Sequence, residues 1–139
     1  MKLAKSFIVF FLLLLPVRME AADFVLVVNK KNPLESMDRS DVKKIFLGKK
    51  TFWPDGQGID VVLLAEGEVH QIFAYDILNK SPRQLTLYWK QELFSGTGVP
   101  PKQLPDNKSV KAAVASNPQA IGYVDILQFD ESVKKIKLD

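Results

Sequence analysis

Three short runs of consecutive apolar residues constrain the fold of this chain more than any other feature. They cover residues 24–28, 61–64 and 120–124. A strand that is apolar at every position is buried on both faces, as strands of parallel sheets are. Segments with apolar residues at helical spacing lie between these runs. The pattern predicts an α/β fold: a three-layer sandwich with a mostly parallel sheet and helices on both faces.

The segments between the strands carry signals for helix starts and ends. Four helices are expected, and they begin after Asp38, near Glu68, after Ser81 and after Asp106 or Asn107. Asp38 is followed three residues later by an acidic residue, in the manner of a capping box. The helix after Ser81 is expected to bury an apolar stripe made of Leu85, Tyr88, Trp89 and Leu93.

Two further expectations concern the periphery of the domain. The tail 133–138 alternates apolar residues with lysines, which suits an edge strand because lysines discourage pairing with another chain. Phe52 and Trp53, in the loop 51–58, are expected to cap the core.

The first 22 residues have the pattern of a secretory signal peptide. Two lysines precede the apolar run 7–15, which is too short to span a bilayer as a helix. Cleavage is expected after Ala21 or Ala22, and the alternative is an uncleaved membrane anchor. The predicted organisation is therefore a signal peptide at 1–22 and one domain at 23–139, exported and without membrane insertion after cleavage.

Charge and residue inventory exclude several classes of function. The formal net charge is +3, and residues 1–21 hold three cations and one carboxylate, which leaves the remainder at only +1. Nucleic acid is therefore not an expected partner. The chain has no cysteine and one histidine, and it lacks phosphate-loop and dinucleotide motifs. No enzyme activity, metal or cofactor is expected.

The strand 61–64 runs through a glycine turn into the second expected helix. Such a helix start leaves free N–H groups at the positive end of the helix dipole. This arrangement is a common anion site in proteins, although an ordinary strand-to-helix connection has the same pattern. The candidate anion-binding residues of the turn and helix start are Glu66, Gly67, Glu68, Val69 and His70.

Several stretches, in a consistent order along the chain, carry a family resemblance. The main ones are V-V-N-K-K-N-P at 27–33, V-K-K-I-F-L-G-K at 42–49, N-K-S-P at 79–82, G-T-G-V-P-P at 96–101 and N-P-Q-A-I-G-Y-V-D at 117–125. Together they resemble the small substrate-binding proteins related to phosphate ABC-transporter binding proteins, which have the type 2 periplasmic-binding-protein fold. The chain looks like about one lobe of that fold.

The resemblance implies a periplasmic or secreted protein that binds phosphate or another small oxyanion non-covalently. An ABC permease or another envelope protein is the implied partner. Asn29 and the tripeptide Ser95, Gly96 and Thr97 are added to the candidate site as neighbours of the turn.

Two departures from the family pattern support an alternative function. Glu68 stands where the family has a hydroxyl at the helix start, and His70 stands where it often has an arginine. A carboxylate at this position repels a bound anion. The alternative is a ligand-free relative of the binding lobe that acts as a protein-interaction module of the envelope.

Overall fold

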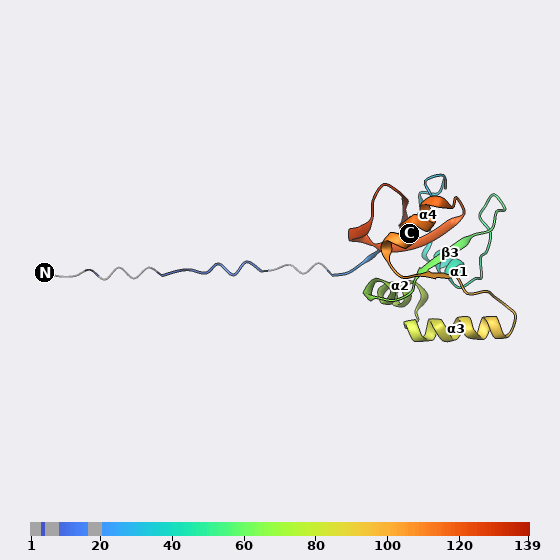
Figure 1. The fold of residues 1–139 in the computed structure, drawn as a ribbon, viewed down its shortest axis with the longest axis horizontal. Helices are drawn as coiled ribbons and strands as arrows, with labels where there is room; N and C mark the ends of the chain where they lie inside the picture. Colours follow the sequence, from blue (N-terminus) through green and yellow to red (C-terminus); the bar gives the residue numbers. More distant parts are fainter. Residues whose placement is uncertain (1–3, 5–8, 17–20) are drawn as a thin grey trace.

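The computed structural model of the chain describes residues 4, 9–16 and 21–139. Part of the expected signal peptide therefore lies outside the described residues. Residues 9–16 extend away from the domain that begins near residue 22 (Figure 1). Within this described part, none of the helices combines the length and the apolar character needed to cross a membrane.

The described residues form one mixed sheet of six strands. The strands are β1 (Phe24–Val28), β2 (Ser36–Met37), β3 (Asp60–Leu64), β4 (Lys102–Leu104), β5 (Ala120–Asp125) and β6 (Lys134–Leu138). Their order across the sheet is β2-β6-β1-β5-β3-β4. β3 is parallel to β4 and β5, and β2 is parallel to β6, whereas β1 is antiparallel to both of its neighbours. The predicted α/β fold with a mostly parallel sheet is confirmed.

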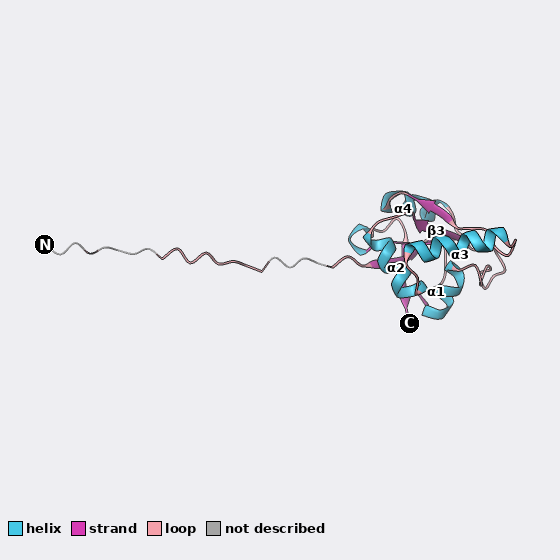
Figure 2. Cartoon of the chain, turned by 90° about the horizontal axis from the view of Figure 1, so that it is seen from below, coloured by secondary structure: helices cyan, strands magenta, loops and turns pink. Residues whose placement is uncertain are grey.

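Helices cover both faces of this sheet, as predicted. They are α1 (Arg39–Phe46), α2 (Glu68–Leu78), α3 (Pro82–Phe94) and α4 (Asn107–Ser116). α4 packs on β5, β3 and β1 from one side, and α2 packs on β1 from the other, with α1 and α3 against α2 (Figure 1). Viewed from below, α3 lies in front of the strands (Figure 2). The helix α2 therefore contacts both the sheet and α3.

An aromatic cluster joins the sheet to the helices α1 and α2. The ring of Phe73 stacks on Tyr123 with a centroid separation of 3.8 Å. Phe46 and Phe24 approach Phe73 edge-on, at 4.7 Å and 5.2 Å. Edge-to-face and offset-stacked pairs stabilise a core beyond the area that they bury. This cluster forms the packed base on which α2 rests.

Some peripheral predictions from the sequence are wrong. β6 is not an edge strand, because the two-residue strand β2 pairs with its outer side. Trp53 is buried, but Phe52 is 63% exposed and does not cap the core. Leu93 points away from the core as well and is 57% exposed. Asp38 precedes α1 without accepting a side-chain cap hydrogen bond, whereas Ser81 forms a complete capping box at the start of α3.

Candidate functional site

The predicted anion turn joins β3 to α2 as expected. Gly67 is the N-cap of α2 and has φ of 101°, a backbone conformation that residues other than glycine disfavour. Among the described residues, the N–H groups of Glu68, Val69 and His70 donate no backbone hydrogen bond. A Cβ placed on Gly67 would have no atom within 4 Å. The first N–H groups of α2 therefore have no hydrogen-bond partner among the described residues, although Val69 and His70 are themselves buried.

Neither carboxylate of this turn lines a cavity together with the histidine. Glu66 and Glu68 are exposed. Glu68 lines a shallow hollow with residues of the same helix, including Asp76. His70 instead lines a cavity of about 330 Å³ between the helix start, α3 and β4. Glu68 does not line this cavity, and because it is exposed, solvent screens its repulsion of an anion held there.

The cavity beside His70 is bordered by positive charge. Its polar lining residues are His70, Arg83, Thr86, Lys90 and Gln103. Its apolar lining residues are Ala65, Pro82, Leu85, Trp89, Leu93 and Pro100. The two cations, Arg83 and Lys90, both come from α3, where Arg83 precedes Thr86 and Lys90 follows it. Of the residues that the structure describes, no aspartate or glutamate lines the cavity, so its electrostatics favour an anion.

His70 is a buried neutral partner of Tyr123. Its Nδ1 lies 2.5 Å from the Tyr123 hydroxyl, and the histidine is only 5% exposed. Burial lowers the pKa of His70 below its usual value, and burial raises the pKa of Tyr123. At neutral pH the imidazole is uncharged and the phenol keeps its proton. His70 therefore does not supply the positive charge that an arginine would bring to this turn.

Acid should destabilise the fold through His70. The unfolded chain takes up a proton near pH 6.5, but the folded chain resists it until a lower pH. The free energy of unfolding should therefore fall as the pH drops from 7 to 5, by less than about 1.4 kcal/mol per pH unit, the limit for one proton. Urea unfolding at several pH values measures this slope.

A His70→Asn variant is the control, since it keeps a hydrogen-bonding group near Tyr123 and should lose the dependence between pH 7 and 5. Asp106 and Asp130 also have lowered pKa values. Their contribution is lost only as the pH falls below the ordinary carboxylate range, so it lies outside this window. An unchanged slope in His70→Asn would contradict the assignment.

Asn29 has a structural role in the observed fold. Its Nδ2 donates to the carbonyls of Val114 and Ala115, both at 2.9 Å, and its Oδ1 accepts from the N–H of Lys31. The side chain is buried against the end of α4. Its two amide hydrogens are engaged within the fold, which leaves none for an anion.

The tripeptide Ser95, Gly96 and Thr97 closes the end of α3. The Ser95 hydroxyl donates to the carbonyl of Gln91 at 2.7 Å, and the Thr97 hydroxyl donates to a carboxylate oxygen of Glu92 at 2.8 Å. None of the three residues lines the cavity beside His70. The tripeptide resembles an anion-binding motif in sequence. In the structure, however, it does not meet the glycine turn at the cavity beside His70.

Arg83, Lys90 and Gln103 are the site residues that sequence reasoning missed. Arg83 and Lys90 lie on the exposed side of α3, where charged residues are usual and carry no recognisable signal. Gln103 comes from the three-residue strand β4, which has no apolar pattern. Their common position depends on how α3 packs over the start of α2.

Residues 14–136 match a family described as the PBP superfamily domain. The chain belongs to this family. Its fold is also found in an ABC-type phosphate transport receptor from Vibrio cholerae, with a TM-score of 0.64 and 25% identity over 84% of this chain and 46% of that one.

Two further solved structures share this fold. One, from Clostridium perfringens and assigned as a phosphate ABC transporter substrate-binding protein, contains bound phosphate; it has a TM-score of 0.65 and 25% identity over 85% of this chain and 45% of that one. PstS from Borrelia burgdorferi has a TM-score of 0.65 at 12% identity, over 85% of this chain and 47% of that one, and shows likeness of fold alone. The PBP domain seen here spans slightly less than half the length of these proteins.

Proposed function

We propose that this chain is an exported substrate-binding-type protein that binds phosphate or another small oxyanion non-covalently at the start of α2. One observation carries the proposal: N–H groups without partners at the start of an 11-residue helix lie beside a cavity that is lined by Arg83 and Lys90 and, in the described part of the chain, by no carboxylate. Helix starts attract anions through these N–H groups and the helix dipole. Binding without covalent chemistry is the function that this arrangement supports.

The affinity should be modest. The relative that contains phosphate is about twice as long as this chain, and a site with one wall surrounds less of an anion than a closed cleft does. Part of the hydration shell stays in place, so each contact is screened by water. We expect a dissociation constant of about 1 mM, which corresponds to about 4 kcal/mol of binding free energy.

Phosphate should stabilise the purified protein against heat. A ligand that binds only the folded state, at ten times its dissociation constant, adds about 1.4 kcal/mol of stability. Thermal unfolding and calorimetry with phosphate, sulfate and chloride at equal ionic strength measure the effect.

Arg83→Gln should weaken phosphate binding several-fold. Arg39→Gln is the matched control, because Arg39 pairs with Asp76 on another surface.

A Glu68→Ser variant sharpens this test. It removes a negative charge from the helix start and adds a hydroxyl beside the free N–H groups. Phosphate binding should become stronger in this variant. The absence of any phosphate-dependent heat or stabilisation at about 10 mM, in both the natural chain and Glu68→Ser, would contradict the proposal.

A second candidate is a protein-interaction module of the envelope that has lost its ligand. The exposed Glu66 and Glu68 favour it, as do the apolar side chains at the end of α3. Phe94 is 96% exposed there and Val99 is 81% exposed. An ABC permease or another envelope protein is the kind of partner it implies. If oxyanions leave both protein variants unaffected, capture of a specific envelope partner that depends on Phe94 would support this function.

A further inference from the structure

His70 carries an unused polar atom at the proposed oxyanion site. The side chain is 5% exposed and lines the cavity of about 330 Å³. Its Nδ1 is paired with the hydroxyl of Tyr123, but its Nε2 has no hydrogen-bond partner among the described residues. Nε2 is not sealed in the core either, because the buried side-chain nitrogen or oxygen without a partner in that part of the chain is Nε1 of Trp89. Nε2 is therefore accessible to a ligand in the cavity.

The hydrogen bond to Tyr123 decides which nitrogen of His70 holds the proton. The Tyr123 side chain is fully buried, and within the described residues its hydroxyl is hydrogen-bonded to Nδ1 of His70. If Nδ1 held the proton, the phenol proton would have no acceptor in the core, which costs free energy. The hydroxyl therefore donates to Nδ1, and the proton of the neutral imidazole is on Nε2.

Packing holds the two rings in this arrangement. Phe73 stacks on Tyr123 and fixes its ring in the core. The rings of Tyr123 and His70 lie within 14° of parallel, and Nδ1 is 2.5 Å from the hydroxyl. Rings stacked face to face are kept about 3.5 Å apart by van der Waals contact, so the hydroxyl meets the edge of the imidazole, where the Nδ1 lone pair lies. Nε2 is on the other side of the ring from Tyr123.

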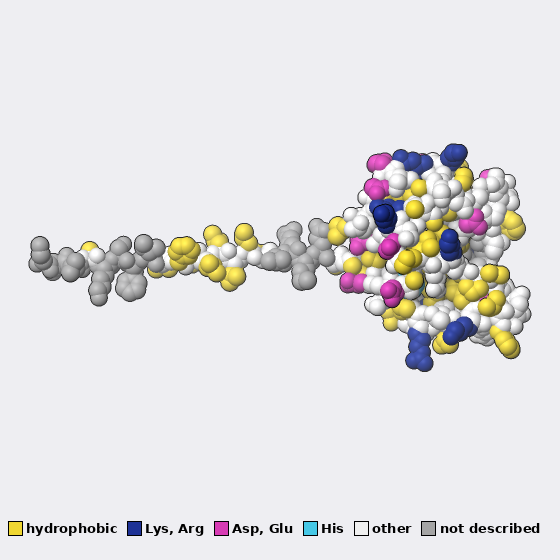
Figure 3. Space-filling view, in the orientation of Figure 1, with side chains coloured by type: hydrophobic (Ala, Val, Ile, Leu, Met, Phe, Trp, Pro, Cys, Tyr) yellow, Lys and Arg dark blue, Asp and Glu magenta, His cyan; other side chains and the backbone are white. Residues whose placement is uncertain are grey.

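The rest of the cavity lining supplies further donors. Arg83 and Lys90 line the cavity and are exposed, and cationic side chains lie among apolar ones over α3, at the lower edge of the domain (Figure 3). Thr86 and Gln103 can donate or accept. Among the lining residues that the structure describes, there is no carboxylate to accept a proton from a ligand. A ligand that is rich in acceptors is therefore the one that fits.

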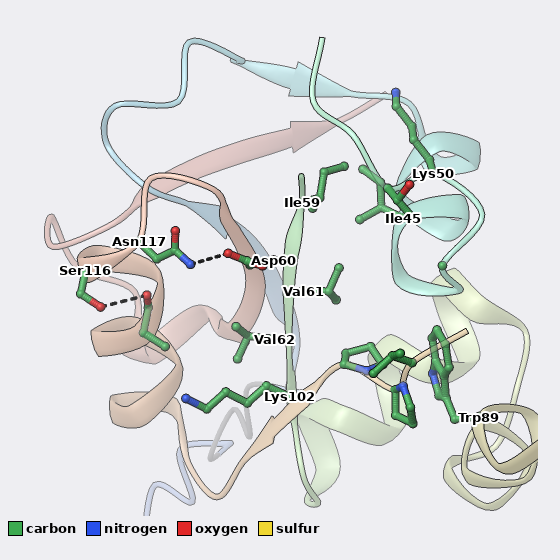
Figure 4. A pocket seen from close by; sticks show the side chains of 16 residues that line it. Ile45, Lys50, Ile59, Asp60, Val61, Val62, Trp89, Lys102, Ser116 and Asn117 are labelled. Atoms are coloured by element: carbon green, nitrogen blue, oxygen red, sulfur yellow. Dashed lines mark hydrogen bonds between the residues drawn. The ribbon is translucent and has the colours of Figure 1, made fainter. Parts of the chain in front are cut away.

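A second cavity, of about 520 Å³, lies over the first half of β3 (Figure 4) and shares Trp89 with the cavity beside His70. Two lysines line it, but so does Asp60, whose carboxylate accepts a 2.7 Å hydrogen bond from the Asn117 amide. A carboxylate repels a bound anion. Of these two cavities, the one beside His70 is therefore the better anion site.

We propose that His70 donates a hydrogen bond from Nε2 to the bound oxyanion and that Tyr123 is the positioning residue that holds the imidazole in this donor tautomer. This inference rests on the oxyanion site proposed at the start of α2 and specifies its ligand class. Because Nε2 donates, the ligand does not have to carry a proton, and fully deprotonated sulfate fits as well as phosphate. With the proton on Nδ1, the Nε2 lone pair would repel sulfate and would accept only from a protonated oxyanion.

Nitrogen NMR of the purified protein tests the tautomer directly. Without a histidine tag the chain has a single histidine, so its imidazole signals are unambiguous. In mildly alkaline buffer, Nε2 should carry the proton and Nδ1 should not, and added sulfate should shift the Nε2–H signal. A proton on Nδ1 overturns the proposal, and this readout uses the natural chain, so it does not depend on how a variant folds.

The role of Tyr123 has its own NMR test. Tyr123→Phe removes the donor to Nδ1 and should shift the Nδ1 signal of His70. Tyr75→Phe is the matched control, because it removes a hydroxyl from a tyrosine that is 60% exposed on the same helix as His70, and it should leave that signal unchanged. An unchanged Nδ1 signal in folded Tyr123→Phe overturns the positioning role.

Two amide substitutions separate the two ring nitrogens in a binding experiment. The amide of glutamine reaches the position of Nε2, whereas the shorter asparagine reaches only that of Nδ1. In calorimetry, the natural chain should bind sulfate and phosphate within about threefold of each other. His70→Asn should weaken the binding of both anions about tenfold, because no donor then reaches the ligand, and His70→Gln should stay within about threefold of the natural chain.

The outcomes distinguish this inference from the oxyanion site itself. If neither anion binds the natural chain, the proposed function fails and this inference fails with it. If both anions bind and Arg83→Gln weakens them, but His70→Asn binds as tightly as the natural chain, the oxyanion site stands and only the role of His70 is overturned. Sulfate binding at least about tenfold weaker than phosphate binding also overturns the donor role of Nε2.

Discussion

Phe73→Ala should lower the free energy of unfolding by about 3–5 kcal/mol, the largest effect expected of any single substitution here. Phe73 is fully buried and contacts three other aromatic rings, which belong to β1, α1 and β5. Removing the ring leaves a cavity at the point where α2 rests on the sheet. Because rings from three separate elements surround the gap, no single element can shift to fill it.

Urea unfolding of Phe94→Ala is the matched control for this variant. Phe94 has the same side chain on the next helix but is 96% exposed. Its truncation should change the free energy of unfolding by less than about 0.5 kcal/mol. A loss below about 1 kcal/mol for Phe73→Ala, or similar losses for both variants, would show that the aromatic cluster is not the main support of α2.

Asn29→Ala should lower the free energy of unfolding by about 2–4 kcal/mol. The substitution leaves the carbonyls of Val114 and Ala115 without the amide that now binds them, and it frees the N–H of Lys31. The bond to the Val114 carbonyl is buried and the bonds to Ala115 and Lys31 are partly buried, so water replaces the lost partner least well at Val114. Buried polar groups without partners carry most of the expected cost.

The same variant separates a structural role from a ligand-binding role. If Asn29 serves the fold, phosphate affinity per folded molecule should be unchanged in Asn29→Ala, measured by calorimetry below the unfolding temperature. Gln128→Ala, which removes an exposed amide, should alter neither stability nor binding. If Asn29→Ala has normal stability but no longer binds phosphate, Asn29 is instead part of the anion site.

The candidate site shows where prediction from the sequence ends. The glycine turn and the helix start at Glu68 could be predicted, because local backbone preference and apolar spacing decide them. The cations beside the turn could not. Arg83 and Lys90 lie on α3, and their place depends on the packing of that helix over α2. Asn29 was added to the candidate site as a neighbour of the turn, and only the structure shows that its amide binds the end of α4.

The sequence by itself determined the strands at 24–28, 61–64 and 120–124 and the four helices between and beside them. Burial on both faces requires an unbroken apolar run, and each helix carries its own start signal. Only the tertiary structure decided the antiparallel placement of β1, the pairing of the two-residue strand β2 with β6, and the two cavities on either side of Trp89. These features depend on contacts between residues far apart in the chain, and such contacts leave no periodic pattern in a single sequence.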